Sequence, residues 1–314
     1  MFPEPHFVES NGIRMAVYED GHGPAVILLH GFPELAFSWR HQLPALAEAG
    51  YRAIAPDQRG YGNTSAPPNV TDYRIEELIA DVHGLLDALG LESAVFIGHD
   101  WGAILLWQMA MLAPQRIERL IILNIPHYPR SPEDPITIWR RRYGSDFYIV
   151  NFHDSDESDR VFASDTKHFF DVTMRCDQLS RQMYDQLPAE RKIVSLLKAL
   201  NKETQSGDPL LNEEERDYYA SAFSSSGFTG PINWYRNWAQ NWQVSEGVDE
   251  TIDIPTLFIG AVDDLIIAPE HIEAMKPLVT DLEIHMLDDC GHWSQQEKPD
   301  DVNRLILDWL VKRG

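Results

Sequence analysis

Residues 94–110, Ala-Val-Phe-Ile-Gly-His-Asp-Trp-Gly-Ala-Ile-Leu-Leu-Trp-Gln-Met-Ala, are the stretch that decides the fold. The apolar run at residues 94–97 predicts a buried strand, and the apolar stretch at residues 103–110 predicts a helix. The turn between them, Gly98-His99-Asp100-Trp101-Gly102, has a glycine on each side, so the backbone can fold tightly under Asp100. Strand, sharp turn and helix in this order are typical of a nucleophile elbow. Serine at its centre would indicate ester or amide substrates, whereas Asp100 indicates that a carboxylate attacks a saturated carbon.

Five more short apolar runs predict the remaining strands of a sheet. They are Ala25–Leu29, Tyr51–Ala55, Leu120–Leu123, Thr256–Ile259 and Glu283–Leu287. Unbroken apolar runs are typical of strands that are covered on both faces, as in a parallel sheet. Helical patterns such as Ile75–Leu89 lie between them. The alternation predicts an α/β fold with a mostly parallel, doubly wound sheet and right-handed crossovers.

The alternation of strands and helices breaks between residues 126 and 248. Prolines at four nearby positions mark a turn-rich entry to this region: Pro126, Pro129, Pro132 and Pro135. Helical patterns such as Arg191–Leu200 follow, with few strand signals. We therefore interpret residues 127–248 as an inserted, mainly helical cap. Residues 1–126 and 249–314 then form the two parts of one α/β core.

Charge and composition exclude several classes of partner. The chain has 314 residues, a formal net charge of −23 and a pI near 4.8, which argues against binding to nucleic acid or to an anionic membrane. Two cysteines make no disulfide framework and fit a reducing compartment. No apolar stretch reaches spanning length, and the first residues lack the basic and apolar regions of a signal peptide. We therefore expect a cytoplasmic protein.

Further polar residues follow other predicted strands. The pair Asp263-Asp264 comes after the strand that begins at Thr256, His292 follows the last strand, and His30 follows the first apolar run. In open parallel sheets, functional residues gather beyond the carboxyl ends of the strands. The order nucleophile, acid, histidine is that of the α/β-hydrolases. Periodicity does not separate Asp263 from Asp264.

These motifs resemble the α/β-hydrolase-fold epoxide hydrolases of microbial and soluble mammalian type. Five segments carry the resemblance: His30-Gly31-Phe32-Pro33-Glu34, Asp57-Gln58-Arg59-Gly60-Tyr61-Gly62, Gly98-His99-Asp100-Trp101-Gly102, Gly291-His292-Trp293 and, at residues 227–237, Gly-Phe-Thr-Gly-Pro-Ile-Asn-Trp-Tyr-Arg-Asn. The resemblance covers nearly the whole chain and is weakest in the cap outside residues 227–237. It implies hydrolysis of a small apolar epoxide by water to a vicinal diol, a detoxifying reaction that needs neither a metal nor an organic cofactor.

The resemblance also implies roles for two cap tyrosines. Asp100 would open the epoxide and become an alkyl ester, and the departing alkoxide would need a proton or hydrogen bonds. Phenols can supply them, because a tyrosine stays protonated at neutral pH. Tyr235 matches one such tyrosine, and Tyr148 is the candidate for the other. Three further tyrosines remain possible substitutes for Tyr148: Tyr143, Tyr218 and Tyr219.

Hydrolysis of the ester would fall to residues of the core. The resemblance implies that His292 activates a water and that Asp264, selected over Asp263 by register against the family, orients the histidine. The backbone N–H groups of Phe32 and Trp101 would hold the oxyanion, with a cis Phe32–Pro33 bond. The indoles expected to line the substrate pocket are those of Trp101, Trp234 and Trp293.

Two alternatives to an epoxide hydrolase remain. A dehalogenase would use the same triad, and Trp101 suits a halide ligand. Phe32 stands where haloalkane dehalogenases often carry asparagine, and residues 103–111 lack the arginines of fluoroacetate dehalogenases. A catalytically idle protein that binds a small ligand is the second alternative. The sequence leaves open the natural substrate, its regio- and enantioselectivity, and the oligomeric state, a homodimer included.

Overall fold

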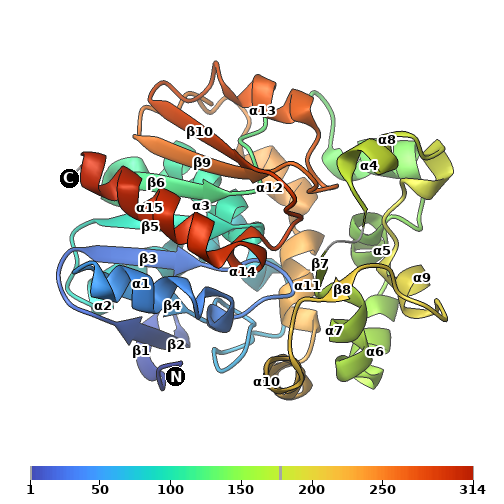
Figure 1. Ribbon diagram of the computed structural model, residues 1–314, viewed down its shortest axis with the longest axis horizontal. Helices are drawn as coiled ribbons and strands as arrows, with labels where there is room; N and C mark the ends of the chain where they lie inside the picture. Colours follow the sequence, from blue (N-terminus) through green and yellow to red (C-terminus); the bar gives the residue numbers. More distant parts are fainter. Residues whose placement is uncertain (1, 177–178, 314) are drawn as a thin grey trace.

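Eight strands form one central sheet in the part of the chain that the structure describes (Figure 1). The computed structural model describes residues 2–176 and 179–313; residues 1 and 314 of the predicted core and 177–178 of the predicted cap lie outside it. In spatial order the strands are β1 (His6–Ser10), β2 (Ile13–Asp20), β4 (Arg52–Pro56), β3 (Ala25–Leu29), β5 (Ala94–His99), β6 (Ile117–Leu123), β9 (Thr256–Ala261) and β10 (Leu282–Leu287). All pairs from β4 to β10 are parallel, which confirms the predicted mostly parallel sheet.

Helices cover both faces of this sheet. On one face pack α1 (Gln42–Glu48) and α15 (Pro299–Arg313), and on the other α2 (Ile75–Ala88) and α3 (Trp101–Leu112). Successive strand residues point to opposite faces, so Ile27 joins the core under α3 and Leu28 the core under α1. Because both faces are apolar and covered, the strands appear in the sequence as continuous apolar runs.

An antiparallel hairpin at the edge of the sheet was not predicted from the sequence. β1 pairs with β2, and β2 pairs antiparallel with β4. Asn11 and Gly12 form the turn with φ of 45° and 74°. Positive φ at both central residues is the requirement of the tight hairpin turn that matches the twist of the strands, and Asn-Gly is its preferred sequence.

The cap lies between β6 and β9 in the sequence and on one side of the sheet, at the right of Figure 1. Its helices are α4 (Pro135–Tyr143), α5 (Tyr148–Asp154), α6 (Glu157–Ser164), α7 (Thr166–Thr173), α8 (Arg181–Asp185), α9 (Leu196–Leu200), α10 (Glu213–Ser226), α11 (Thr229–Arg236) and α12 (Trp238–Val244). A short antiparallel pair joins β7 (Arg175–Cys176) to β8 (Asp208–Pro209). The mainly helical cap is thus confirmed, but the predicted helical stretch 191–200 was too long, because only Leu196–Leu200 is α-helical.

Short elements complete the core. They are the 3-10 turns η1 (Ala36–Trp39), η2 (Val70–Tyr73) and η3 (Pro114–Arg116) and the helices α13 (Pro269–Met275) and α14 (Ser294–Glu297). The cap has one such turn, η4 (Ala189–Arg191), among its described residues. Cap and core approach closely where a Cβ on Gly230 would lie 2.9 Å from the Cα of Gly60. Within residues 2–176 and 179–313, no helix is long and apolar enough to cross a lipid bilayer.

Asp57, at the carboxyl end of β4, is a buried carboxyl group that makes stability depend on pH. It is 2% exposed and accepts hydrogen bonds from the amides of Ala36 and Asn63 and from the hydroxyl of Tyr18. Burial outweighs these bonds and raises its pKa to about 6. Since the folded state then binds this proton more tightly than the unfolded state, the protonated group contributes stability below about pH 4 that is lost as the pH rises through 6.

We therefore expect the wild-type protein to lose stability relative to the Asp57→Asn variant as the pH rises from 4 to 7. A pKa displaced by about two units corresponds to about 3 kcal/mol in the difference between the two unfolding free energies. Urea unfolding at several pH values measures this difference. Parallel pH profiles for the two proteins would contradict the expectation.

Candidate active site

Asp100 occupies the sharp turn between β5 and α3. Its φ of 50° and ψ of −117° are a conformation that residues other than glycine rarely adopt, and the packing around it must hold it there. A Cβ on Gly102 would lie 2.0 Å from the carbonyl oxygen of Leu29, and one on Gly31 would lie 2.3 Å from the Cβ of Asp100. The glycines therefore let the elbow and the loop after β3 meet beneath the carboxylate.

The two oxygens of the Asp100 carboxylate have different surroundings. Oδ1 accepts a hydrogen bond of 2.8 Å from the amide of Phe32, whose bond to Pro33 is cis. Oδ2 lies 3.6 Å from Nε2 of His292. Burial would raise the pKa of Asp100, but the hydrogen bond and charge of His292 outweigh it and hold the pKa below its ordinary value. The carboxylate is therefore ionised at neutral pH, with one oxygen held and the other facing the histidine.

His292 lies between two carboxylates. Its Nδ1 is 2.9 Å from Oδ2 of Asp264, which is fully buried and also bonded by the side-chain amide of Asn124 at 2.8 Å. Burial would lower the pKa of His292, but Asp264 and then Asp100 raise it well above its ordinary value. Asp263 points elsewhere and accepts a 2.7 Å hydrogen bond from the amide of Arg181 in the cap. Of the two adjacent acids, the structure brings Asp264 to the histidine.

A buried network behind these residues escaped the sequence analysis. Glu34 is fully buried. Its carboxylate accepts from the amide of Gly31 at 3.0 Å and from two side-chain amides of α14 at 2.8 and 2.9 Å. It also lies 2.7 Å from Nδ1 of His99, whose Nε2 is 2.7 Å from the carbonyl oxygen of His292. Glu34 and His99 thus link the loop before Phe32, the elbow and the histidine loop.

Two cap phenols stand over the elbow. Tyr235, on α11, packs its ring 5.4 Å from that of Phe32 and 5.0 Å from that of Trp101. Tyr148 begins α5, with its ring 5.8 Å from that of Tyr235 at an interplanar angle of 73°. Burial, and next the charge of Asp100, raise the pKa of both phenols far above the ordinary value. Both hydroxyls are therefore protonated and able to donate at neutral pH.

The alternative tyrosines lie in other surroundings. Tyr143 packs against Phe147 at the end of α4, with ring centroids 4.9 Å apart. Tyr218 stacks on Phe37 at 4.3 Å, and its neighbour Tyr219 is buried with its ring 5.3 Å from that of Phe170. Tyr148, in contrast, contacts the ring of Tyr235. The structure therefore brings Tyr148, rather than one of its substitutes, beside Tyr235.

The three tryptophans expected around a substrate are placed differently. Trp101 packs on Tyr235 and begins α3, where its amide precedes the first intrahelical hydrogen bond. The indole N–H of Trp234 donates to the carbonyl of Arg59 at 3.1 Å, so this ring fastens the cap to the core. Trp293 is 7% exposed and packs beside the His292 ring at 4.8 Å. That Trp101, Trp234 and Trp293 line a pocket stays a prediction.

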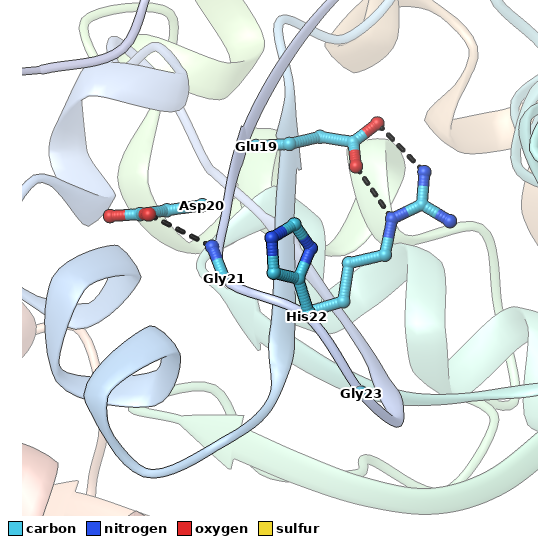
Figure 2. Close-up of a pocket in the computed structure, with 6 residues that line it drawn as sticks. Glu19, Asp20, Gly21, His22 and Gly23 are labelled. Carbon is cyan, nitrogen blue, oxygen red and sulfur yellow. Dashed lines mark hydrogen bonds and ion pairs between the residues drawn. The ribbon is translucent and has the colours of Figure 1, made fainter.

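A surface pocket of about 640 Å³ lies at the opposite end of the sheet, between β2 and β3. Figure 2 shows the carboxylate of Glu19 bonded to an arginine and that of Asp20 bonded to Gly21. Glu19 binds Arg52 at 2.6 Å, and Asp20 accepts from the amide of Gly21 at 2.8 Å. The residues that line this pocket come just before β3, whereas the elbow lies at the carboxyl ends of the strands. Among the described residues, no group of three or more His, Cys, Asp or Glu is arranged to hold a metal ion.

Comparisons with known proteins agree with this geometry. A family model described as "alpha/beta hydrolase fold" matches residues 24–299, and with the parallel sheet and the elbow it defines the class of the protein. Epoxide hydrolase A of Mycobacterium tuberculosis is 38% identical over 319 residues, which cover 98% of each chain. The crystal structure of epoxide hydrolase A from Mycobacterium thermoresistibile matches with a TM-score of 0.89 and 38% identity over 98% of each chain. The chain belongs to the epoxide hydrolases of the α/β-hydrolase fold.

A third relative is longer than this protein. Bifunctional epoxide hydrolase 2 of Sus scrofa is 38% identical over 95% of this chain and 53% of its own length. The chain therefore spans about half of that relative.

Proposed function

We propose that the protein hydrolyses small apolar epoxides to vicinal diols through a covalent ester on Asp100. One observation carries the proposal: two protonated phenols stand above a carboxylate whose free oxygen faces a histidine. The ring of Tyr235 packs on Phe32 and Trp101, the two residues that flank the carboxylate, and Tyr148 packs on Tyr235. The similarity to named epoxide hydrolases over the full chain supports the same substrate class.

In the first step Oδ2 of Asp100 attacks a ring carbon of the epoxide. A new C–O bond forms, the ring C–O bond breaks, and its electron pair goes to the departing oxygen. Tyr148 and Tyr235 hydrogen-bond that oxygen, and a proton from one phenol makes it a hydroxyl group. The Phe32 amide, 2.8 Å from Oδ1, holds the carboxylate for this attack.

In the second step His292 removes a proton from a water that attacks the carboxyl carbon of the ester. The tetrahedral intermediate then breaks its bond to Oδ2, which leaves in the diol with the proton that His292 had taken. The remaining proton of the water returns to the tyrosinate left by the first step. Ester formation has removed the negative charge of Asp100, which is one of the causes that raise the pKa of His292. The pKa of His292 is therefore lower once the ester exists, and more of the histidine is neutral and able to accept a proton. Asp264 stabilises the imidazolium that forms. The Phe32 amide already lies at Oδ1, where the oxyanion develops, and the Trp101 amide is the proposed second donor.

A single turnover in heavy-oxygen water tests the covalent step. With enzyme in excess over an aryl epoxide, we expect the diol to carry unlabelled oxygen from Asp100. The label should appear in the peptide that contains Asp100 after the ester has been hydrolysed. Mass spectrometry of the diol and of this peptide measures both. Label that passes from water directly into the diol of the first turnover would contradict a covalent intermediate.

A further inference from the structure

The two helices that carry the phenols are not fastened to the core in the same way. Figure 1 shows α11 between the sheet and α5. The side chains of α11 and its end bond the core directly: the Trp234 indole donates to the carbonyl of Arg59 at 3.1 Å, and the Asn237 amide donates to that of Val70 at 2.6 Å. At the start of α5, the amide of Tyr148 donates instead to the carbonyl of Val194 within the cap. The hydrogen bond at this end of α5 therefore stays within the cap, and α5 meets the core through the ring of Phe152, 5.7 Å from that of Phe32.

Arg236, the neighbour of Tyr235, joins the two helices. Its Nε donates to the carbonyl of Phe152 at 3.0 Å, and its Nη2 donates to that of Ser155 at 3.0 Å. These carbonyls belong to the last turn of α5 and to the residue that caps it. The carbonyls of a last helical turn have no partner within the helix and carry partial negative charge, which favours a cation there.

The remaining donors of Arg236 are also used. Nη1 and Nη2 bind the carboxylate of Asp159 on α6 at 3.1 and 2.7 Å, and Nη1 donates to the side-chain oxygen of Asn233 on α11 at 2.9 Å. The side chains of Arg236 and Asp159 are 13% and 9% exposed. All five N–H bonds of the guanidinium therefore have acceptors on three helices, an arrangement that the three N–H bonds of a lysine cannot reproduce.

We propose that Arg236 is a positioning residue that sets the placement of Tyr148 relative to Tyr235. The inference rests on the proposed function, because it concerns the step in which both phenols bind the epoxide oxygen. Arg236 holds one end of α5, and Tyr148 lies at the other end, about 10 Å away along a seven-residue helix. A small tilt of α5 about its end at Arg236 moves the Tyr148 hydroxyl away from the place where it and the Tyr235 hydroxyl would bind the epoxide oxygen together.

The two chemical steps separate this role from a general loss of structure. Opening of the epoxide uses both phenols, whereas hydrolysis of the ester uses His292 and Asp264, which lie in the core. In a rapid-quench single turnover, we expect Arg236→Lys to form the ester about ten- to a hundred-fold more slowly, as for a misplaced catalytic group. The ester, once formed, should be hydrolysed at the wild-type rate. Arg160→Lys is the matched control, because Arg160 pairs with Asp156 on the exposed surface of α6.

Chemical rescue gives a second measurement. A surface pocket of about 480 Å³ is lined by Arg236, Asp159 and Ser155, so Arg236→Ala leaves a space that small cations can reach. We expect added guanidinium to restore ester formation in Arg236→Ala and methylammonium of equal concentration to fail. If the alanine variant does not fold, the lysine variant decides alone.

Three results would overturn the inference without touching the proposed function: a folded Arg236→Lys protein that forms the ester at the wild-type rate, an equal loss in both steps, or equal rescue by both cations. Failure of the wild-type protein to form either ester or diol would overturn the proposed function, and the inference with it.

Discussion

The double substitution Tyr148→Phe and Tyr235→Phe is expected to slow epoxide opening by roughly 10⁴-fold, the upper range for the loss of general acid catalysis. An alkoxide is a strong base and leaves poorly without a donor. The two hydroxyls are the groups placed to donate, and burial and the charge of Asp100 keep both protonated. Rapid-quench measurement of ester formation with an aryl epoxide gives the rate of this step. Each single substitution should retain part of the rate, because the other phenol remains.

The control for this experiment is Tyr143→Phe. Tyr143 is also a half-buried tyrosine of the cap, but it packs against Phe147 rather than Tyr235. Its substitution should leave ring opening unchanged. A folded double variant that still opens epoxides at a rate close to that of the wild-type protein would exclude the phenols as the donors. Release of halide from a haloalkane without diol formation from epoxides would instead favour the dehalogenase alternative.

Much of the fold was predictable because its strongest signals are local. Each central strand is covered on both faces and therefore appears as an apolar run, and the elbow needs its glycines within five residues of sequence. The edge hairpin was missed because most of β1 is exposed to solvent, so it contains only two apolar residues, Phe7 and Val8, and forms no apolar run. Asn11-Gly12, with positive φ at both residues, was the local signal that could have revealed it.

The supporting residues of the site could not be predicted in the same way. Glu34 has the sequence surroundings of a loop residue, and its burial results from α14, which is more than 250 residues away in sequence and donates to it. The position of Asn124 could have been recognised from the sequence, because Asn124 follows β6 at the carboxyl edge of the sheet. Its side-chain amide donates a hydrogen bond of 2.8 Å to Asp264, and this contact depends on where the chain returns after the cap. Long-range contacts of this kind leave no pattern in a single sequence.

The choice between Asp263 and Asp264 shows what the structure adds. The two side chains have different partners. Asp264 accepts from the amide of Ile266 at 2.9 Å and reaches His292, whereas Asp263 bonds the cap at Arg181. The turn after β9 therefore serves both the proposed base and the attachment of the cap.

His292→Gln is expected to trap the protein as its alkyl ester. The phenols and the carboxylate remain, so ring opening should proceed, while hydrolysis should slow by about 10³–10⁴-fold without a general base. Glutamine can still donate to Asp264, so this buried carboxylate keeps a donor in place of the histidine that lies 2.9 Å away. Intact-protein mass spectrometry after acid quench should show a gain equal to the mass of one epoxide, and consumption of epoxide should stop after about one equivalent per active site, with almost no diol released.

The residue that carries the trapped mass tests the proposed roles of the cap in ring opening and of the core in ester hydrolysis. Fragmentation should place the added mass on Asp100, and Asp100→Asn in the same background should abolish it. His285→Gln is the matched control, because His285 lies half-buried on β10 and pairs with Glu283 away from the elbow. It should turn over like the wild-type protein. A folded His292→Gln protein that loses ring opening as completely as hydrolysis would mean that the histidine is needed before the ester exists. The proposed sequence, in which the cap phenols drive the first step and the His292–Asp264 pair the second, would then be wrong.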